Sequence, residues 1–298
     1  MAALLWLLLL SADGLIAAAL CRVVAGPLHL SAWACGMWVL AVFLLAPWTL
    51  TSVSVLLRAR AGDSLVWSSL ARAALTEWAS STLAVMRMIV EPWRRSPDSA
   101  GADNKQSRPV LLLHGVVCNR GIWRGWLREL RAAGFTPVRA LNLEPLLADI
   151  PTQAAHVARE LVALQRASSG ARIDVIAHSM GGLIARAALP LVGPQTIRRI
   201  VTLASPHHGT RVARHYRGAP VRQMRPDSPW LATLNAEQED HWSVPVTSIY
   251  SLEDNLVVPA DSARLAGADC HPLRGVGHFG LLGSRAARRC ALAALSPG

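Results

Sequence analysis

The sequence predicts an α/β fold in which helices cover both faces of a mostly parallel sheet, preceded by transmembrane and amphipathic N-terminal helices. Two observations predict this arrangement. From residue 109 onward, short β-rich apolar runs alternate with helical segments, and this alternation requires crossover connections between parallel strands. Residues 1–57, in contrast, hold only Asp13 and Arg22 as charged side chains, so the whole formal charge of +11 belongs to the rest of the chain.

Two apolar stretches occupy the N-terminus. Residues 2–20 and 28–57 approach or exceed the roughly 20 residues that an α-helix needs to cross a bilayer. The short segment between them contains Gly26 and Pro27, as a helical hairpin requires. A cleaved signal peptide and a buried soluble helix pair are the alternatives, but no Lys or Arg precedes the first stretch, and a second stretch follows at once. We expect a membrane hairpin over residues 1–60.

The charges that flank these stretches favour one orientation. Arg58 and Arg60 follow the second stretch, whereas Arg22 alone lies between the two. The cytoplasmic segments of membrane proteins are enriched in Lys and Arg. The bias therefore favours a cytoplasmic position for both termini and for the domain that follows the hairpin.

Residues 65–93 form the next segment, with apolar side chains at helical spacing and Arg72, Glu77 and Arg87 between them. This pattern predicts an amphipathic helix that either lies on the membrane or packs on the following domain. Residues 94–108 contain proline, glycine and aspartate and have the composition of a linker. The expected organisation is a membrane hairpin over 1–60, an amphipathic helix and linker over 61–108, and a compact α/β domain over 109–298.

The compact domain contains the alternation of strands and helices. The predicted strands are 110–113, 136–141, 172–177, 197–203, 244–250 and 271–275, and the predicted helices are 122–133, 152–167, 180–191, 262–265 and a last one from 278 towards 295. Residues 211–243 are expected either to cover a site as a lid or to form a surface helix with an ordinary buried face.

Ser179 lies where a predicted strand meets the following helix. Small residues two positions on either side of it, Ala177 and Gly181, allow the chain to turn sharply and to raise the hydroxyl above the sheet. The common form of this turn has glycine in the first of these positions, and alanine is small enough to replace it. The helix N-terminus supplies N–H groups and a positive dipole end where an oxyanion could form. We predict that Ser179 is a nucleophile; the alternative is an ordinary turn serine.

A nucleophilic serine needs a histidine to accept its proton and a carboxylate to orient that histidine. The family resemblance described below implies that the acid and then the histidine follow the serine along the chain. His278 lies in a glycine-flanked loop after the last predicted strand, and Asp254 follows the strand before it. We predict His278 as the base and Asp254 as the acid, with Glu253 and Asp261 as alternative acids.

Backbone N–H groups at two places can stabilise an oxyanion in such a site. Met180 directly follows the nucleophile, and Val116 follows the His-Gly pair that ends an early buried strand. We predict these two residues as the donors, with Val117 as an alternative to Val116. His114 precedes the serine and is expected to brace the loop.

Together these motifs resemble the bacterial lipases and esterases of the α/β-hydrolase superfamily, in particular those with Ala-x-Ser-x-Gly at the nucleophile. The resemblance covers about residues 109–290. It implies a triad of Ser179, Asp254 and His278, oxyanion donors Val116 and Met180, and no cofactor or metal. The motifs that carry it are Leu113-His114-Gly115-Val116, Ala177-His178-Ser179-Met180-Gly181-Gly182, Ser248-Ile249-Tyr250-Ser251 through Asp254 to Val258, and Gly275-Val276-Gly277-His278-Phe279-Gly280-Leu281-Leu282.

The same resemblance extends to the loop around His207 and His208, two adjacent histidines that are not expected to bind a metal, and to Asp174, expected to be a structural strand residue. We expect a serine carboxylic-ester hydrolase that acts on lipid-like acyl esters and is anchored in a bacterial inner membrane. A thioesterase or acyltransferase with the same triad is an alternative, and a catalytically silent hydrolase-like binding module is another. The positive charge is scattered as single or paired residues, which argues against a nucleic-acid partner.

Overall fold

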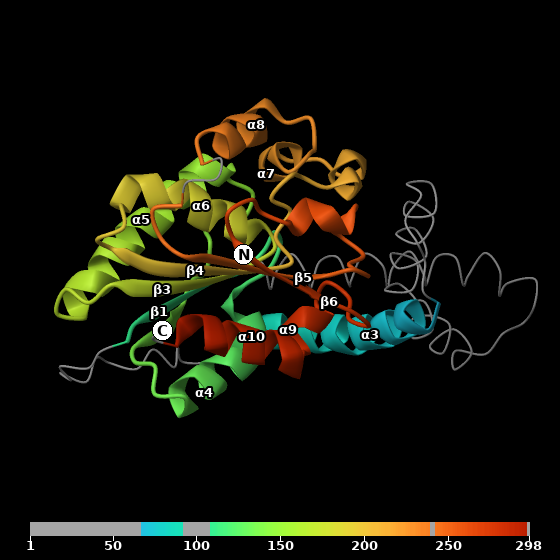
Figure 1. Cartoon of the computed structure of the whole chain (residues 1–298), viewed down its shortest axis with the longest axis horizontal. Coiled ribbons are helices and arrows are strands. Elements are labelled where there is room, and N and C mark those ends of the chain that lie inside the picture. The colour runs from blue at the N-terminus through green and yellow to red at the C-terminus, as the bar shows by residue number, and fades with distance from the viewer. Residues whose placement is uncertain (1–66, 92–107, 239–241, 297–298) are drawn as a thin grey trace, which may run out of the picture.

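A six-stranded parallel sheet forms the centre of the computed structural model, which describes residues 67–91, 108–238 and 242–296 (Figure 1). The strand order is β2-β1-β3-β4-β5-β6, and each neighbouring pair is parallel. This confirms the predicted parallel sheet. The strands are β1 (Val110–Leu113), β2 (Val138–Ala140), β3 (Ile173–His178), β4 (Ile197–Leu203), β5 (Val246–Ser251) and β6 (Asp269–Leu273).

Helices cover both faces of the sheet (Figure 1). Helices α5 (Ile150–Ala167) and α6 (Met180–Val192) pack on one face, and α4 (Arg124–Ala132) and α10 (Arg285–Leu295) pack on the other, beside a longer helix, α3 (Trp67–Val90). The shorter helices are η2 (Arg120–Trp123), η3 (Arg211–His215), α7 (Ala219–Gln223), α8 (Pro229–Ala236), η4 (Ala260–Ala263) and α9 (Gly280–Gly283).

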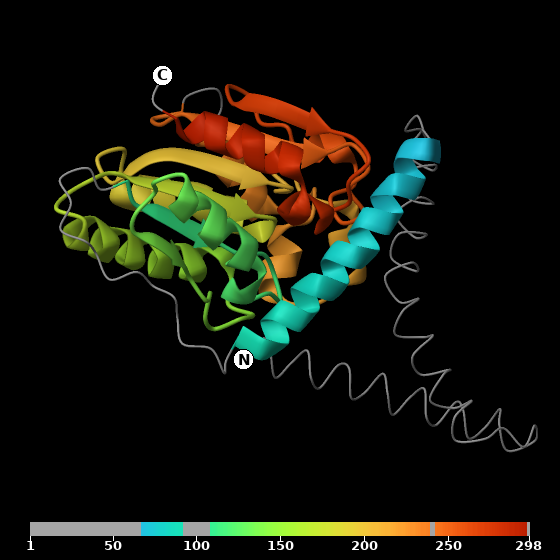
Figure 2. The same ribbon diagram turned by 90° about the horizontal axis from the view of Figure 1, so that it is seen from below.

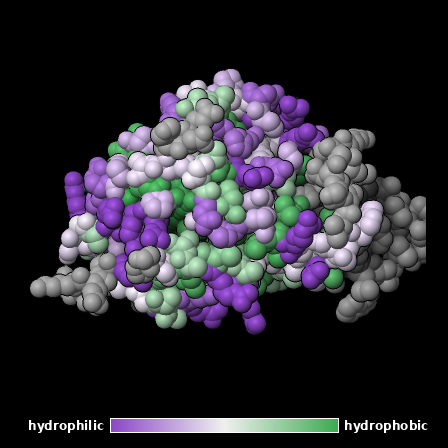
Figure 3. All heavy atoms as spheres, in the orientation of Figure 1, coloured by the Kyte–Doolittle hydropathy of each residue, from purple (hydrophilic) through white to green (hydrophobic). Residues whose placement is uncertain are grey.

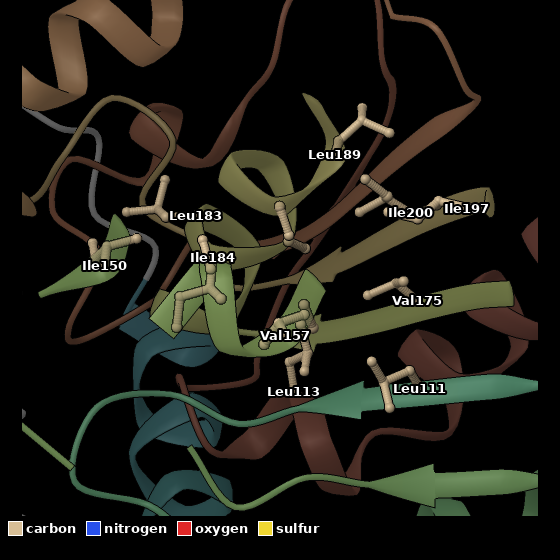
Figure 4. Close-up of a cluster of buried hydrophobic side chains, with 14 of the residues drawn as sticks. Leu111, Leu113, Ile150, Val157, Val175, Leu183, Ile184, Leu189, Ile197 and Ile200 are labelled. Atoms are coloured by element: carbon tan, nitrogen blue, oxygen red, sulfur yellow. The ribbon is translucent and has the colours of Figure 1, made fainter. Parts of the chain in front are cut away.

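Two hydrophobic clusters hold these layers together. Successive side chains of a strand point to opposite faces, and β1 follows this rule: Leu111 and Leu113 join the cluster with α5 and α6, whereas Val110 and Leu112 join the cluster with α4 and α10. Figure 4 shows the first cluster, with side chains from β1, β3, β4, α5 and α6. All four β1 side chains are buried, so β1 lies in the interior of the sheet.

The C-terminal region differs from the expected single helix. Ser284 has an extended backbone (φ −68°, ψ 123°), which separates α9 from α10, and its hydroxyl accepts a hydrogen bond from the Ala287 N–H at 3.3 Å. A serine in this conformation is a favourable N-cap. The strand before it, β6, also begins and ends two residues earlier than predicted.

Residues 211–238 contain three short helices, η3, α7 and α8, whose bounds the sequence analysis did not identify. Leu231 and Leu234 of α8 are buried in the same cluster as Leu183 of α6. Helix α8 therefore packs as a surface helix with an ordinary buried face, which is one of the two expected alternatives.

Helix α3 packs against the domain and crosses one end of it (Figure 2). Ala84 and Met88 belong to the cluster around Trp123, and the Asn119 side-chain amide donates a hydrogen bond to the Met88 carbonyl at 2.9 Å. These contacts favour packing on the domain for this helix. The predicted hairpin over residues 1–60 lies outside the described residues. Among the helices in the described ranges, none is both long and apolar enough to span a membrane.

Candidate active site

Ser179 lies on a strained turn between β3 and α6. Its backbone has φ 58° and ψ −128°, a region that residues other than glycine rarely adopt and that costs about 1–3 kcal/mol. The Ser179 N–H donates to the Leu203 carbonyl at 2.8 Å, and the Ser179 carbonyl accepts from the Gly182 N–H at 3.0 Å. The residue is 9% exposed. The hydroxyl thus stands at the carboxyl end of the sheet, as the motif predicts.

Two glycines allow the chain to fold closely around this turn. A Cβ atom on Gly115 would lie 2.8 Å from the Ser179 Cβ, and one on Gly181 would lie 2.7 Å from the Leu113 carbonyl oxygen. Either approach is closer than real Cβ contacts allow. The loop after β1 therefore lies directly against Ser179 because these positions are glycine.

His278 and Asp254 form a buried pair. The two carboxylate oxygens of Asp254 each lie 3.0 Å from His278 Nδ1, and both side chains are 2% exposed. Asp254 Oδ1 also accepts hydrogen bonds from the Leu256 and Val257 N–H groups at 2.8 Å, which orient the carboxylate. The His278 Nδ1 atom is thereby committed to Asp254, and Nε2 is the ring nitrogen left for chemistry.

The pair lies at the same end of the sheet as Ser179. The ring of His178, the residue before Ser179, has its centroid 4.7 Å from that of His278, and His178 Nε2 lies 3.3 Å from the His278 carbonyl oxygen. A carbonyl can only accept, so this His178 nitrogen carries the proton. Burial, followed by the His278 charge, lowers the pKa of His178 well below its ordinary value, so His178 is a neutral contact.

The electrostatic surroundings of His278 favour its charged form. Burial acts to lower the pKa of His278, but the charge of Asp254 and its hydrogen bond, together with the charge of Glu77, outweigh burial and raise the pKa above 6.5. A histidine with a raised pKa holds an accepted proton more strongly. The site is therefore electrostatically suited to an imidazolium.

The loop after β1 is braced by His114. Its Nε2 accepts a hydrogen bond from the Leu143 N–H at 3.0 Å, so its Nδ1, 2.8 Å from the Gly115 carbonyl oxygen, is the protonated nitrogen. Burial lowers the pKa of His114 to about 4 and keeps it neutral. These contacts confirm the bracing role predicted for this residue.

The two predicted oxyanion donors flank Ser179. Met180 is the first residue of α6, so its N–H has no partner within the helix. Val116 directly follows Gly115, which lies against Ser179, and within the described residues its N–H has no hydrogen-bond acceptor. Both N–H groups are therefore available to an oxygen bound at this place.

The alternative residues have other partners. Glu253 accepts hydrogen bonds from Ser69 Oγ at 2.6 Å and from the Gly275 N–H at 2.8 Å, and Asp261 is exposed on η4, so Asp254 alone of the three contacts His278. Asp174 binds Arg198 of β4, which confirms its predicted structural role.

The adjacent histidines do not share a ligand position. His207 contacts Thr202 and Arg186, whereas His208 contacts Asn235. In the part of the chain that the structure describes, no cluster of three or more His, Cys, Asp or Glu side chains could hold a metal ion.

Two residues of the site were missed by the sequence analysis. Glu77 of α3 accepts a hydrogen bond from the Gly280 N–H at 2.9 Å, and the Asn255 side chain accepts one from the His278 N–H at 3.0 Å. Glu77 shares the buried face of its helix with Leu70, Ala73 and Ala84. A carboxylate on the apolar face of an amphipathic helix was the signal that could have identified it.

Comparisons with known proteins support the fold. The structure is similar to lipase B from Aspergillus fumigatus (TM-score 0.56, 23% identity), covering 63% of this chain and 52% of that one, so this chain spans about half the length of that lipase. It is also similar to the mature form of lipase BlEst2 from Bacillus licheniformis (TM-score 0.59, 15% identity), covering 68% of this chain and 98% of that one. The fold is therefore that of the α/β-hydrolases.

A family model matches part of the chain. Residues 80–221 match a domain of unknown function, DUF7379. No curated protein matches the sequence.

Proposed function

We propose that this chain is a serine carboxylic-ester hydrolase of the lipase or esterase type, acting on lipid-like acyl esters. One observation carries the proposal: a buried His278–Asp254 pair lies at the same end of the sheet as Ser179, which occupies a strained strand-to-helix turn. The Ala-x-Ser-x-Gly form of that turn supports placement among the lipases that share it. From these positions we assign Ser179 as the nucleophile, His278 as the base and Asp254 as the acid.

In the proposed reaction, His278 Nε2 accepts the proton of Ser179 Oγ as that oxygen bonds to the carbonyl carbon of the ester. The carbonyl oxygen becomes an oxyanion, to which the Val116 and Met180 N–H groups donate. His278 then gives the proton to the departing alcohol, which leaves Ser179 acylated. Water then attacks the acyl carbon and gives a proton to His278. As the bond between the acyl carbon and Ser179 Oγ breaks, His278 returns that proton to Oγ, which releases the carboxylic acid and restores the Ser179 hydroxyl. The cycle as written requires no cofactor.

Replacing Ser179 with alanine tests this function. We expect Ser179→Ala to lose labelling by a fluorophosphonate probe and to reduce hydrolysis of a chromogenic acyl ester by at least about 1,000-fold, since the acyl-enzyme cannot form. The matched control is Ser169→Ala, because Ser169 is an exposed serine with nearly the same backbone angle (φ 55°) in a turn after α5. Full activity in Ser179→Ala would refute the assignment.

A panel of acyl donors separates the related activities. Esters and thioesters of graded chain length, with and without an alcohol acceptor, are offered to the full chain. Hydrolysis of esters above thioesters, and no acyl transfer, is the result expected. A chain that neither labels nor turns over any donor is instead a hydrolase-like binding module.

We also propose that residues 1–60 anchor the chain in a membrane, with residues 109–298 as the catalytic domain on the cytoplasmic side. The exposed face of α3 supports this proposal, because it carries a stripe of apolar side chains and α3 follows the apolar N-terminal stretches in the sequence. Trp67 is 72% exposed, Leu75 58% and Met86 57%. An apolar helix face of this kind favours a lipid surface. The stripe comprises Trp67, Ala71, Leu75, Ala79, Leu83, Met86 and Val90.

A further inference from the structure

The loop that carries His278 is held by α3, a helix that precedes the first strand. Thr76 Oγ1 donates to the Gly275 carbonyl at 3.4 Å, and Glu77 Oε2 accepts from the Gly280 N–H at 2.9 Å. The two bonds lie at the two ends of the loop 275–280. Helix α3 therefore contacts the loop on both sides of His278.

Glu77 occupies the centre of this contact. Its side chain lies within the protein, with 3% of the residue exposed, and among the described residues no Arg or Lys forms an ion pair with it. A Cβ atom on Gly277 would lie 2.5 Å from Glu77 Oε2, so the loop approaches the carboxylate as closely as glycine permits. Among the charged groups around Glu77, His278 has the largest effect on the pKa of Glu77, and it lowers that pKa.

Asn255 interacts with both Glu77 and His278. Its side chain lowers the pKa of Glu77, and its Oδ1 accepts a hydrogen bond from the His278 N–H at 3.0 Å. Asp254, the neighbour of Asn255, contacts the His278 ring. Asp254 thus holds the ring of His278 and Asn255 holds its backbone, while Glu77 binds the Gly280 N–H two residues further along the loop.

We propose that Glu77 is a positioning residue for the reaction, a second carboxylate that fixes the His278 loop and stabilises the positive charge that His278 acquires. The inference rests on the proposed function, since only in that cycle does His278 become charged. It assigns a role in the site to a helix outside the region that resembles lipases. Asp254 contacts the imidazole directly, whereas Glu77 acts through Gly280, Asn255 and its own charge.

The ionisation of Glu77 is sensitive to its surroundings. Burial raises the pKa of Glu77 to about 7, against the lowering effects of the His278 charge, the Gly280 N–H and the Asn255 side chain, and with a further rise from Asp254. The charge of His278 therefore lowers the pKa of Glu77, and the charge of Glu77 raises the pKa of His278. The other titratable or charged groups around the loop are His178, Glu253, Arg274 and Arg72.

The variant Glu77→Gln tests the inference, because it removes the charge and keeps an oxygen that can accept from Gly280. Loss of a negative charge lowers the pKa of His278, so we expect the acid limb of kcat/KM to move to lower pH by about 0.5–1 unit. We also expect kcat to fall about tenfold at the plateau with KM little changed, since the imidazolium forms less readily. Glu91→Gln, on the residue after the same helix, is the matched control, because Glu91 pairs with Arg120 away from the loop.

A direct titration separates this inference from the proposed function. The ring signals of His278 are followed by NMR against pH in the full chain and in Glu77→Gln, with Ser179→Ala as a background that cannot turn over. A lower His278 pKa in Glu77→Gln supports the inference even if no ester is hydrolysed. An unchanged His278 pKa, with kcat within twofold of the parent, overturns it. If Glu77→Gln does not fold, the titration of His278 is measured in the parent chain instead. A titration in two steps indicates coupling to Glu77, and a titration in a single step excludes it.

Discussion

At the scale of single residues, the site is determined by backbone geometry as much as by side chains. The left-handed backbone of Ser179 is tolerated because Gly115 and Gly181 let neighbouring segments approach without collision. Two backbone N–H groups donate to the carboxylate of Asp254 and hold it in the orientation in which it contacts His278. Such supporting contacts fix a reactive geometry ahead of substrate binding.

The pH dependence of activity follows from the raised pKa of His278. In the proposed reaction, His278 must be neutral to accept the Ser179 proton, so activity is expected to rise as the pH increases through the pKa of His278. Because Asp254 and Glu77 outweigh burial, this pKa lies above 6.5. We expect the acid limb of kcat/KM, measured with an ester that does not itself titrate, to have its midpoint above pH 6.5. A midpoint below 6.5 would contradict this account of the site.

The sequence predicted some residues of the candidate site and not others for a physical reason. Ser179, Asp254 and His278 each occupy a recognisable place, at the end of a strand or in a glycine-flanked loop, and local pattern alone located them. The structure brings the last two within hydrogen-bonding distance. The position of Glu77 in the site depends on how α3 crosses the domain, which no local pattern encodes.

At the scale of elements, α3 joins both the core and the site. Its C-terminal half contributes Ala84 and Met88 to a hydrophobic cluster, and its N-terminal half binds the loops after β5 and β6 through Ser69 and Glu77. The helix was predicted from its apolar spacing. Its polar contacts could not be predicted, because their partners lie nearly 200 residues away, with Ser69 and Glu253 separated by 184 residues.

Neighbouring serines on α3 provide a matched test of this docking. Ser69 is buried and donates to Glu253 Oε1 at 2.6 Å, whereas Ser68 is exposed. Both changes to alanine improve helix propensity slightly, but only Ser69→Ala removes a buried hydrogen bond between α3 and Glu253. We expect Ser69→Ala to lower the free energy of unfolding by about 1–2 kcal/mol and Ser68→Ala to change it by less than about 0.5 kcal/mol. Urea unfolding of both variants measures the difference, and equal effects would show that α3 is not held in this way.

The strands were predicted more accurately than the helices outside the sheet. Strands β1 and β4 match their predicted ranges, because a buried strand is a short apolar run bounded by turn residues. Helices α7 and α8 are five and eight residues long, too short to show a clear helical period. Helix α8 is held by tertiary contacts such as the bond from the Arg186 guanidinium of α6 to the Asn235 side chain at 2.8 Å.

At the scale of the whole molecule, hydrophilic side chains cover much of the face shown in Figure 3, with apolar areas between them, whereas α3 exposes an apolar stripe elsewhere. The domain boundary near residue 109 stays a prediction. The contacts of α3 argue for a folding unit that includes this helix. A unit of that kind would begin close to the proposed membrane anchor.

Fractionation of the full chain tests the proposed anchor. We expect the protein to stay with the membrane after an alkaline wash, because two apolar stretches of about 20 residues or more resist extraction. For its orientation, Ser169→Cys places a thiol on an exposed turn, and the parent chain is the control for the native cysteines. A membrane-impermeant maleimide is expected to label this cysteine only after the cells are opened. Release by the wash, or labelling of intact cells, would contradict the anchor or its orientation respectively.

The bond between Glu77 and Gly280 has a consequence for biosynthesis, because it joins residues 203 positions apart. Translation at about 5–20 residues per second places roughly 10–40 s between the emergence of the two partners. Contacts of such long range form slowly, since the entropy of closing the intervening chain must first be lost. The newly made protein is therefore expected to gain the proposed activity only once its final helices have left the ribosome, after the proposed anchor would already have been inserted.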